Sequence, residues 1–535
     1  LREIITKLRE PVRSLMAFYG AGDHGGGATR ENIESIVTLP KQPGAPQVLF
    51  STPEKYFGEV RDTKGLPVVR DDLQHHAVGC YSTLADFKKN NRKSESWLQA
   101  GEKWAVVGAV AGGLRYPREE FTAAWKKVLF QQFHDILAGT SLPEHYVEAR
   151  NAHGYALEIA SSALLNSALK IATQVPATDP NSEYLVVFNP HAWAALLPVE
   201  YDLDWPMRLP GGARAPETVS VLEDDSGRPV LHQWTAGSTV TGARTGLAFL
   251  ADVPPFGYRQ YRLRRVGQAE APAAALEVTE QKLENAHLRA ELDASGSLRL
   301  FDKDGARPVL AQSGARAVVL DDPSDTWSHN VRDYSKEIGA FGGARFQVLE
   351  KGPLRAVLQV RATYGASTLV QDWILYRDAR HLECRVRLDW HERLRALKFS
   401  FPVNVTEPKA AYEIAYGHIE RKTAGEEDPG QRWVDVSGKD YGLALINDAK
   451  YGYSVLGNDL RMTVLRSPVY AHHDPRKLQP GQDYLYQDQG EHAFRLLLLP
   501  HAGAWADARV TRLAEELNAP VPVIYQGIHG GSRPA

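Results

Sequence analysis

Hydrophobic and polar positions divide the chain into a helical part and a β-rich part. Residues 80–175 carry apolar residues at helical spacing, which predicts three longer helices. Beyond residue 181, short apolar runs separated by Gly, Pro and Asp predict strands, and from residue 290 onward the alternation predicts packed antiparallel sheets. Ahead of the helices, residues 46–52 predict a strand, followed by a helix that begins at Pro53 and is capped by Ser51 or Thr52.

These patterns predict a multidomain α+β fold. Residues 1–70 are expected to form the C-terminal part of an α/β domain, and residues 71–178 a helical bundle. Residues 179–268 are expected to form a small β-sandwich and residues 276–535 a large β-sandwich, joined by an Ala/Pro-rich linker.

Composition narrows the possible partners. The 535 residues carry a net charge of −3, which suggests no global attraction to nucleic acid or to membranes. The densest basic run, residues 88–93, has no aromatic ladder that would stack bases, so a solvated helix face is expected. The two cysteines, Cys80 and Cys384, cannot form a disulfide framework, which fits a reducing, cytoplasmic compartment. The sequence therefore predicts neither nucleic-acid nor membrane binding, and leaves homo-oligomerisation open.

An imidazole and a carboxylate stand side by side at the end of one predicted amphipathic helix. Apolar residues from Phe121 to Ile136 recur at helical spacing and Gly139 ends the pattern, so His134 is expected in the last turn. A neutral imidazole is the commonest protein ligand for zinc, and Asp135 could accept hydrogen bonds from sugar hydroxyls. A satisfied histidine near a helix C-terminus is the alternative.

Two further loops carry candidate chemistry. A glycine-rich loop at residues 20–27 presents Asp23 without bulk around it, and it lacks the Walker and dinucleotide patterns that would predict phosphate binding. The loop at residues 322–329 combines Asp325, Trp327 and His329, a composition suited to a sugar whose apolar face stacks on indole. An ordinary turn explains either loop as an alternative.

Taken together, these segments resemble the cytosolic and bacterial type of family 38 α-mannosidases. The motifs follow one another in the family's order over essentially the whole chain. They are YGAGDHGGGAT at 19–29, HAVGCYS at 76–82, QFHDILAGT at 132–140, FNPHAW at 188–193, LEN at 283–285, QDW at 371–373, LDWHE at 388–392, YEIAYG at 412–417 and NDAKYGY at 447–453.

The resemblance implies a zinc-dependent retaining glycoside hydrolase that removes terminal α-linked mannose from oligosaccharides. In such an enzyme one aspartate attacks the anomeric carbon and a second carboxylic acid, about 5 Å away, protonates the leaving oxygen. By match to the family pattern, His134 is a zinc ligand, Asp135 and Tyr81 contact the substrate, and Asp23 is the candidate acid/base. The resemblance also implies one divalent ion per full-length enzyme, a barrel-like catalytic α/β domain, and a helical bundle that contributes to the active site.

In related enzymes a loop of the β region reaches the active site, and the loop with Asp325 and Trp327 is our candidate for that role. A noncatalytic carbohydrate-binding protein is the alternative function, but it would need neither the His134-Asp135 pair nor Asp23. A different β-rich hydrolase would be expected to carry paired glutamates on barrel strands, and no such pair is evident.

The chain departs from the family pattern at both ends. The family's His-x-Asp strand and its Pro-Asp-x-Phe-Gly-like nucleophile turn are not found before Asp23, and residues 526–535 resemble the entry to a further β segment. We therefore expect a fragment that lacks the N-terminal catalytic segment and the extreme C-terminus, and that is inactive alone. The one His-x-Asp string, His472-His473-Asp474, lies in a turn-rich stretch and lacks the family's Trp, so it is not expected to replace the missing ligands. Weak or absent zinc binding by residues 1–535 follows, because His134 and Asp135 supply at most two ligands.

Overall fold

The computed structural model describes residues 8–21, 26–69, 77–203, 220–237, 245–266 and 275–534. The chain forms two compact units, Leu1–Gln74 and His75–Ala535. In its described part the first unit contains α2 (Arg30–Thr38), the 3₁₀ helix η1 (Leu39–Lys41) and α3 (Pro53–Val60).

Side-chain caps begin both α-helices of the first unit. The Thr52 side chain accepts a hydrogen bond from the Lys55 N–H at 3.2 Å, with Pro53 in the first turn, so the helix expected there is confirmed. The strand expected at residues 46–52 is wrong, because the described residues of this unit include no strand. An extended segment needs a neighbouring strand to pair its backbone groups, and periodicity alone does not supply one.

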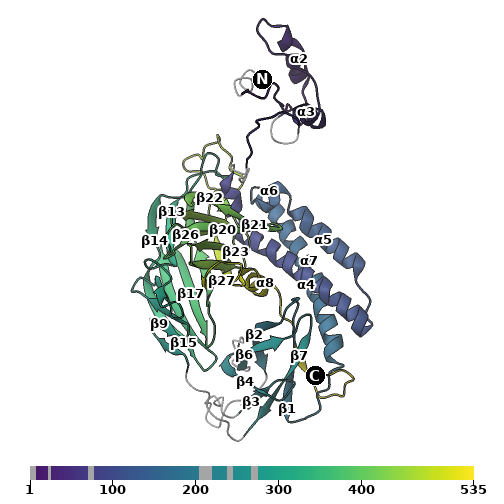
Figure 1. Ribbon diagram of the computed structural model, residues 1–535, viewed down its shortest axis with the longest axis vertical. Helices are drawn as coiled ribbons and strands as arrows, with labels where there is room; N and C mark the ends of the chain where they lie inside the picture. Colours follow the sequence, from purple (N-terminus) through teal and green to yellow (C-terminus); the bar gives the residue numbers. More distant parts are fainter. Residues whose placement is uncertain are drawn as a thin grey trace. The chain divides into compact units, whose positions relative to one another are not determined.

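The second unit begins with a helical layer of α4 (Ala85–Gly112), α5 (Arg118–Gln131) and α7 (Pro143–Ala172), which confirms the three longer helices (Figure 1). Small residues let α4 and α7 approach closely: a Cβ built on Gly108 would lie 2.5 Å from Ser167 Oγ. The core shared by the three helices consists of Leu98, Ala105, Phe121, Ala124, Val128, Ala156 and Ala160. Within the described residues, no helix is long and apolar enough to cross a membrane.

The helix that leads to His134 ends earlier than predicted. α5 stops at Gln131, Phe133 takes ψ 143°, and a separate short helix, α6 (His134–Leu137), follows. The prediction of one helix through Ile136 is therefore wrong, and His134 is the first residue of α6 rather than part of the last turn of α5. The break has a local cause, because the Phe133 carbonyl accepts hydrogen bonds from Ile136 and Leu137, both at 2.9 Å, and so begins a new turn.

A smaller β region follows the helices. One sheet has the order β28-β1-β7-β3-β4 and the other β2-β6-β5, and their facing sides share a core that includes Leu185, Leu197 and Phe249. The strands are β1 (Ser182–Phe188), β2 (Ala195–Leu203), β3 (Ser220–Glu223), β4 (Pro229–Val230), β5 (His232–Ala236), β6 (Thr245–Val253), β7 (Tyr258–Arg265) and β28 (Val523–Gln526). The pairing of β28 with β1 departs from the expectation that residues 276–535 form one sandwich, because the last strand extends the smaller sheet.

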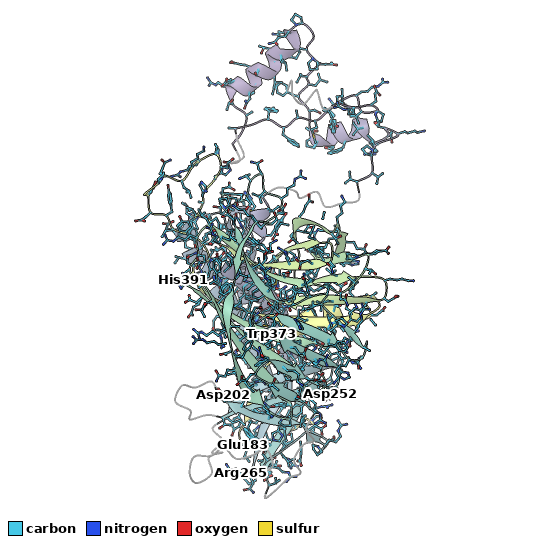
Figure 2. All side chains as sticks on the ribbon, turned by 90° about the vertical axis from the view of Figure 1, so that its left-hand side faces the viewer. Glu183, Asp202, Asp252, Arg265, Trp373 and His391 are labelled. Atoms are coloured by element: carbon cyan, nitrogen blue, oxygen red, sulfur yellow. The ribbon has the colours of Figure 1, made fainter. Side chains whose placement is uncertain are left out.

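The larger β region contains a nine-stranded sheet, β15-β16-β17-β18-β27-β24-β23-β20-β21, and a six-stranded sheet, β14-β13-β19-β26-β25-β22, which share one core. Trp373 on β17 is fully buried in that core (Figure 2). The nine-stranded sheet comprises β15 (Gly342–Lys351), β16 (Arg355–Tyr364), β17 (Ser367–Tyr376), β18 (Leu382–Trp390), β20 (Lys409–Ile414), β21 (Gly417–Arg421), β23 (Trp433–Ser437), β24 (Tyr441–Asn447) and β27 (Gly490–Ala502). The six-stranded sheet comprises β13 (Arg316–Asp321), β14 (Glu337–Ala340), β19 (Arg395–Pro402), β22 (Ala424–Pro429), β25 (Gly452–Leu456) and β26 (Asp459–Arg466).

Two further elements complete the larger β region. A five-stranded meander contributes to the same core, and α8 (Val510–Asn518) packs through Val510, Ala514 and Leu517 on the nine-stranded sheet. The meander comprises β8 (Glu277–Thr279), β9 (Lys282–Glu284), β10 (Leu288–Leu292), β11 (Leu298–Asp302) and β12 (Arg307–Pro308). The antiparallel sheets expected from the alternating pattern are confirmed.

The basic run on α4 is not the solvated face that its composition predicts. Lys88 and Arg92, one turn apart, are both buried, and Lys88 donates to the carbonyls of Thr83 and Leu137. Arg92 donates to Asn447 Oδ1 at 2.9 Å and to the Lys450 carbonyl at 2.8 Å. Long-range acceptors thus satisfy charges that the local sequence suggests should face water.

One buried histidine predicts how stability depends on pH. Burial lowers the pKa of His153 on α7 to about 4, and its Nδ1 lies 2.9 Å from Ser94 Oγ. Between about pH 6.5 and 4 the unfolded chain binds a proton that the folded chain excludes, so stability falls by up to about 3 kcal/mol as pH drops through this window. Urea unfolding at several pH values should show a shallower dependence in His153→Gln. The exposed His391→Gln should keep the wild-type dependence, and an unchanged slope in His153→Gln would contradict the assignment.

Candidate functional site

Three segments that are distant in sequence meet around the short 3₁₀ helix η2 (Val78–Tyr81). The Gly79 N–H donates to the Trp327 carbonyl at 3.0 Å, which joins η2 to the loop between β13 and β14. The Lys88 ammonium donates to the carbonyls of Thr83 and Leu137, the latter at 2.8 Å, which joins η2 to the end of α6. Burial lowers the pKa of Lys88 to about 8.

Arg466, the last residue of β26, holds these segments together from inside. Burial alone lowers its pKa, but the Asp322 carboxylate at 2.8 Å outweighs that effect and keeps the guanidinium charged. The guanidinium donates to Asp322 Oδ1 and Oδ2, Ser324 Oγ, Thr83 Oγ1 and the carbonyls of Asp325 and Thr326. Glycine is required at position 79, because a Cβ there would lie 2.2 Å from Arg466 Nη1.

His134 and Asp135 lie on the exposed side of this junction. Their side chains are 74% and 49% exposed, and His134 Nε2 lies 3.4 Å from Asp135 Oδ2. The backbone beneath them is fixed, because the Asp135 carbonyl accepts hydrogen bonds from the Thr140 N–H at 3.1 Å and from the Tyr146 hydroxyl at 3.2 Å. A rigid turn therefore presents an imidazole and a carboxylate together.

The loop between β13 and β14 brings a carboxylate, an indole and two imidazoles together. Asp325 Oδ2 accepts from His329 Nδ1 at 2.6 Å and from the Asp474 N–H at 2.9 Å, and Oδ1 accepts from the His329 N–H at 2.9 Å. Burial by itself raises the pKa of Asp325, but these hydrogen bonds outweigh it and lower the pKa below its ordinary value. Trp327 stacks on His329 and meets His473 edge-on, with ring centroids 6.0 and 5.1 Å apart.

His473 is the residue that sequence reasoning named but to which it gave no role as a ligand. It follows β26 in a separate loop, and no local pattern links it to the loop with Asp325. Among the described residues, Asp325, His329 and His473 form a group in which one potential metal-ligand atom from each lies within 4.8 Å of the others. His134 and Asp135 belong to no such group of three within the part of the chain that the structure describes.

The remaining predicted site residues have different outcomes. Tyr81 is partly buried on η2 and packs beside Val78 and Tyr334, and its expected contact with the substrate stays a prediction. Asp23 lies outside the described residues, and its expected position facing the same cleft as His134 stays a prediction.

Cys80 reports on the electrostatics at the centre of the junction. Burial raises the pKa of the Cys80 thiol, Lys88 and Arg466 oppose this, and the carboxylates of Asp325 and Asp135 both add to it. The loop with Asp325 and the short helix α6 with Asp135 therefore each place a carboxylate near η2, which suits a cation or the hydroxyls of a polyol.

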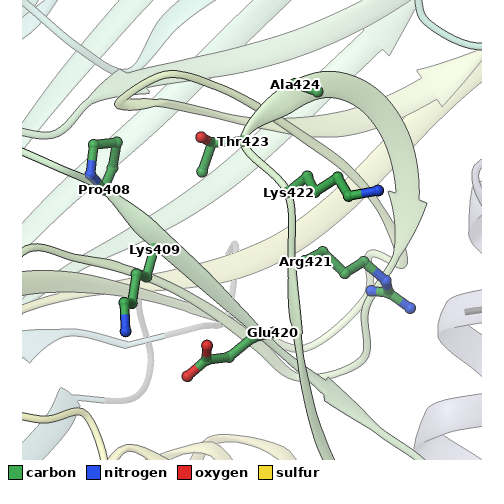
Figure 3. A pocket seen from close by; sticks show the side chains of 7 residues that line it. All are labelled: Pro408, Lys409, Glu420, Arg421, Lys422, Thr423 and Ala424. Atoms are coloured by element: carbon green, nitrogen blue, oxygen red, sulfur yellow. The ribbon is translucent and has the colours of Figure 1, made fainter. Parts of the chain in front are cut away.

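Other chemistry-bearing motifs serve the fold. Asp488 accepts hydrogen bonds from the N–H groups of Leu84 and Ala85, at 2.9 and 2.8 Å, and so caps α4. Asp389 and His391 form an exposed pair 2.8 Å apart at the end of β18. A surface pocket of about 430 Å³ at the edge strand β21 is lined by none of the candidate residues (Figure 3). Its lining consists of Pro408, Lys409, Glu420, Arg421, Lys422, Thr423 and Ala424.

Two family models match the second unit. Residues 75–171 match the α-mannosidase middle domain, and residues 283–476 match the C-terminal domain of family 38 glycosyl hydrolases. The chain belongs to glycoside hydrolase family 38. Within this family 38 chain, the matched ranges include Tyr81, the His134-Asp135 pair, the loop with Asp325 and Trp327, and His473.

Curated relatives and a solved structure extend the match. The chain is 26% identical over 562 residues to Alpha-mannosidase G of Dictyostelium discoideum and 28% identical over 541 residues to Alpha-mannosidase 2C1 of Homo sapiens. Each match covers 94% of this chain, but 48% and 46% of the relatives, so the chain spans about half their length. An α-mannosidase structure from Enterococcus faecalis V583 shares the fold, with a TM-score of 0.73 and 15% identity, covering 95% of this chain and 66% of that one.

The burial of Arg466 predicts a large effect of its removal. Arg466→Met leaves Asp322 charged and unpaired in the interior, which should reduce the free energy of unfolding by about 3–5 kcal/mol. Arg387 pairs with Asp372 at 2.9 Å but is more than half exposed, so Arg387→Met should change stability by no more than about 1 kcal/mol. Urea unfolding of both variants tests this, and equal small losses would show that the junction does not depend on Arg466.

Proposed function

We propose that this chain is the helical and β-rich part of a zinc-dependent retaining α-mannosidase, which releases terminal α-linked mannose from oligosaccharides. The observation that carries the proposal is the exposed His134-Asp135 pair on a rigid turn, joined through η2 to a loop with a carboxylate and an indole. The relatives named α-mannosidase, which match 94% of the chain, support the same activity.

The donor types at α6 fit zinc, but their number does not complete a site. An imidazole nitrogen and a neighbouring carboxylate are ligands that zinc accepts, whereas a catalytic site normally has three protein ligands. We propose that His134 is one ligand and that the other ligands and the nucleophile come from the rest of a full-length protein. When bound, the ion would bind sugar hydroxyls and help to distort the ring.

The chain's own residues would then divide the remaining work. Asp135 and Tyr81 would bind the sugar hydroxyls, and Trp327 would stack on the apolar face of a sugar ring. Asp23 would give a proton to the leaving oxygen and later take a proton from the attacking water, as retaining chemistry requires. Cys80 and Cys384 are both unpaired, which supports a cytoplasmic enzyme.

The role of Asp23 can be tested in a full-length protein that contains this chain and the nucleophile. Asp23→Ala should slow hydrolysis of a mannoside with a poor leaving group about 10²–10⁴-fold more than hydrolysis of one with an activated aryl leaving group, because only the former needs a proton on departure. Added azide should restore turnover of the activated substrate, because azide, unlike water, attacks the glycosyl-enzyme without a general base. Steady-state kinetics on both substrates measure this.

Asp62, an exposed carboxylate of the same unit, provides the matched control, and Asp62→Ala should leave both rates unchanged. Equal losses on both substrates without azide rescue would assign Asp23 to sugar binding or to loop structure. Mannose binding by the unaltered full-length protein without hydrolysis of either substrate would favour the noncatalytic alternative.

A further inference from the structure

Asp325, His329 and His473 combine three metal-binding side chains from two loops of the β region. One potential ligand atom of each lies within 4.8 Å of the others. Tetrahedral zinc with bonds of about 2.0–2.2 Å holds its ligand atoms roughly 3.4 Å apart, so the widest pair needs to close by up to about 1.4 Å. The His473 side chain is exposed at the surface and can turn to make that adjustment.

Hydrogen bonds hold both imidazole rings in place. His329 Nδ1 is bonded to Asp325 Oδ2 at 2.6 Å, and His473 Nδ1 is bonded to the Asp474 carbonyl. In His473, whose Nδ1 donates to that carbonyl, Nε2 carries the lone pair that can bind a metal, and the carbonyl behind the ring is the usual arrangement that orients a histidine ligand. At His329 the ion would take the place of the proton between Nδ1 and Asp325 Oδ2.

The charge at this cluster also suits a cation. The Asp474 N–H donates to the Asp325 carboxylate at 2.9 Å and fixes its position. The nearest buried cation, Arg466, is bonded to the Asp322 carboxylate and to the carbonyl of Asp325, rather than to the Asp325 carboxylate. The cluster therefore offers one negative charge that a guanidinium does not already neutralise.

We propose that Asp325, His329 and His473 form a divalent transition-metal site, distinct from the one to which His134 contributes. Two imidazoles and one carboxylate supply three protein ligands, which leaves a coordination position for water or a hydroxyl. The ion would tie the loop after β13 to the loop after β26, and so would hold Trp327 in place. A full-length enzyme would then bind two ions, and the inference does not depend on the proposed activity.

The test uses the tag-free 535-residue chain, stripped with a chelator and titrated with zinc. Calorimetry, together with metal analysis after dialysis, should find one zinc per chain and a raised melting temperature. His473→Ala should weaken zinc binding by more than about 100-fold, beyond the roughly 10–100-fold loss typical of an outer-shell partner. His473 is exposed, so the variant should keep its circular dichroism spectrum. Cobalt substituted for zinc should give a visible absorption band that His473→Ala loses.

Two control variants locate the ion. His134→Ala should bind zinc as the unaltered chain does, and so should His391→Ala, whose imidazole also lies beside a carboxylate but without a third ligand. Zinc lost in His134→Ala and kept in His473→Ala would overturn the proposal while supporting His134 as a ligand. The absence of stoichiometric zinc from the unaltered chain, or equal binding by all variants, would also overturn the proposal.

Discussion

A single buried guanidinium, that of Arg466, fixes the geometry on which the candidate site depends. It lies at the end of β26, yet its partners include Thr83 beside η2 and three residues of the loop after β13. Without Arg466, the Asp322 carboxylate would be buried and charged without a partner. Separation of η2 from the loop after β13 and from the end of β26 would therefore break this ion pair. The planar fork of arginine also sets directions, which a lysine would not do.

Burial separates the charges that build the junction from those that are left for chemistry. Lys88, Arg92 and Asp488 are buried and bonded. Lys88 donates to the carbonyls of Thr83 and Leu137, and Arg92 and Asp488 bond across the interface between α4 and the β region. His134 and Asp135 are exposed and bonded mainly through their backbone, so their side chains stay available. The loop with Asp325 is intermediate, since its carboxylate is buried and bonded while His473 beside it reaches the surface.

The sequence predicted what local periodicity encodes and missed what distant partners decide. The spacing of apolar residues in α4, α5 and α7 and the alternation in β16 to β18 are properties of single segments, and the structure confirms these elements. The burial of Arg92, the pairing of β28 with β1 and the approach of His473 to Asp325 each depend on residues more than a hundred positions away. The early end of α5 was missed because hydrogen bonds to the Phe133 carbonyl begin a new turn, which the spacing of apolar residues does not encode.

The motifs that carry the family resemblance encode packing more than chemistry. Gly79 leaves room for Arg466, and the amide of Asn447 bonds to the Tyr453 hydroxyl at 2.5 Å and accepts from Arg92, so these motifs preserve the junction itself. Asn285 likewise joins its turn to the carbonyls of Tyr376 and Ala379. A chain could keep all of these motifs and bind sugar without hydrolysing it, whereas the His134-Asp135 pair is exposed and stabilises little. Retention of an exposed imidazole and carboxylate on so rigid a turn is therefore the stronger argument for a catalytic role.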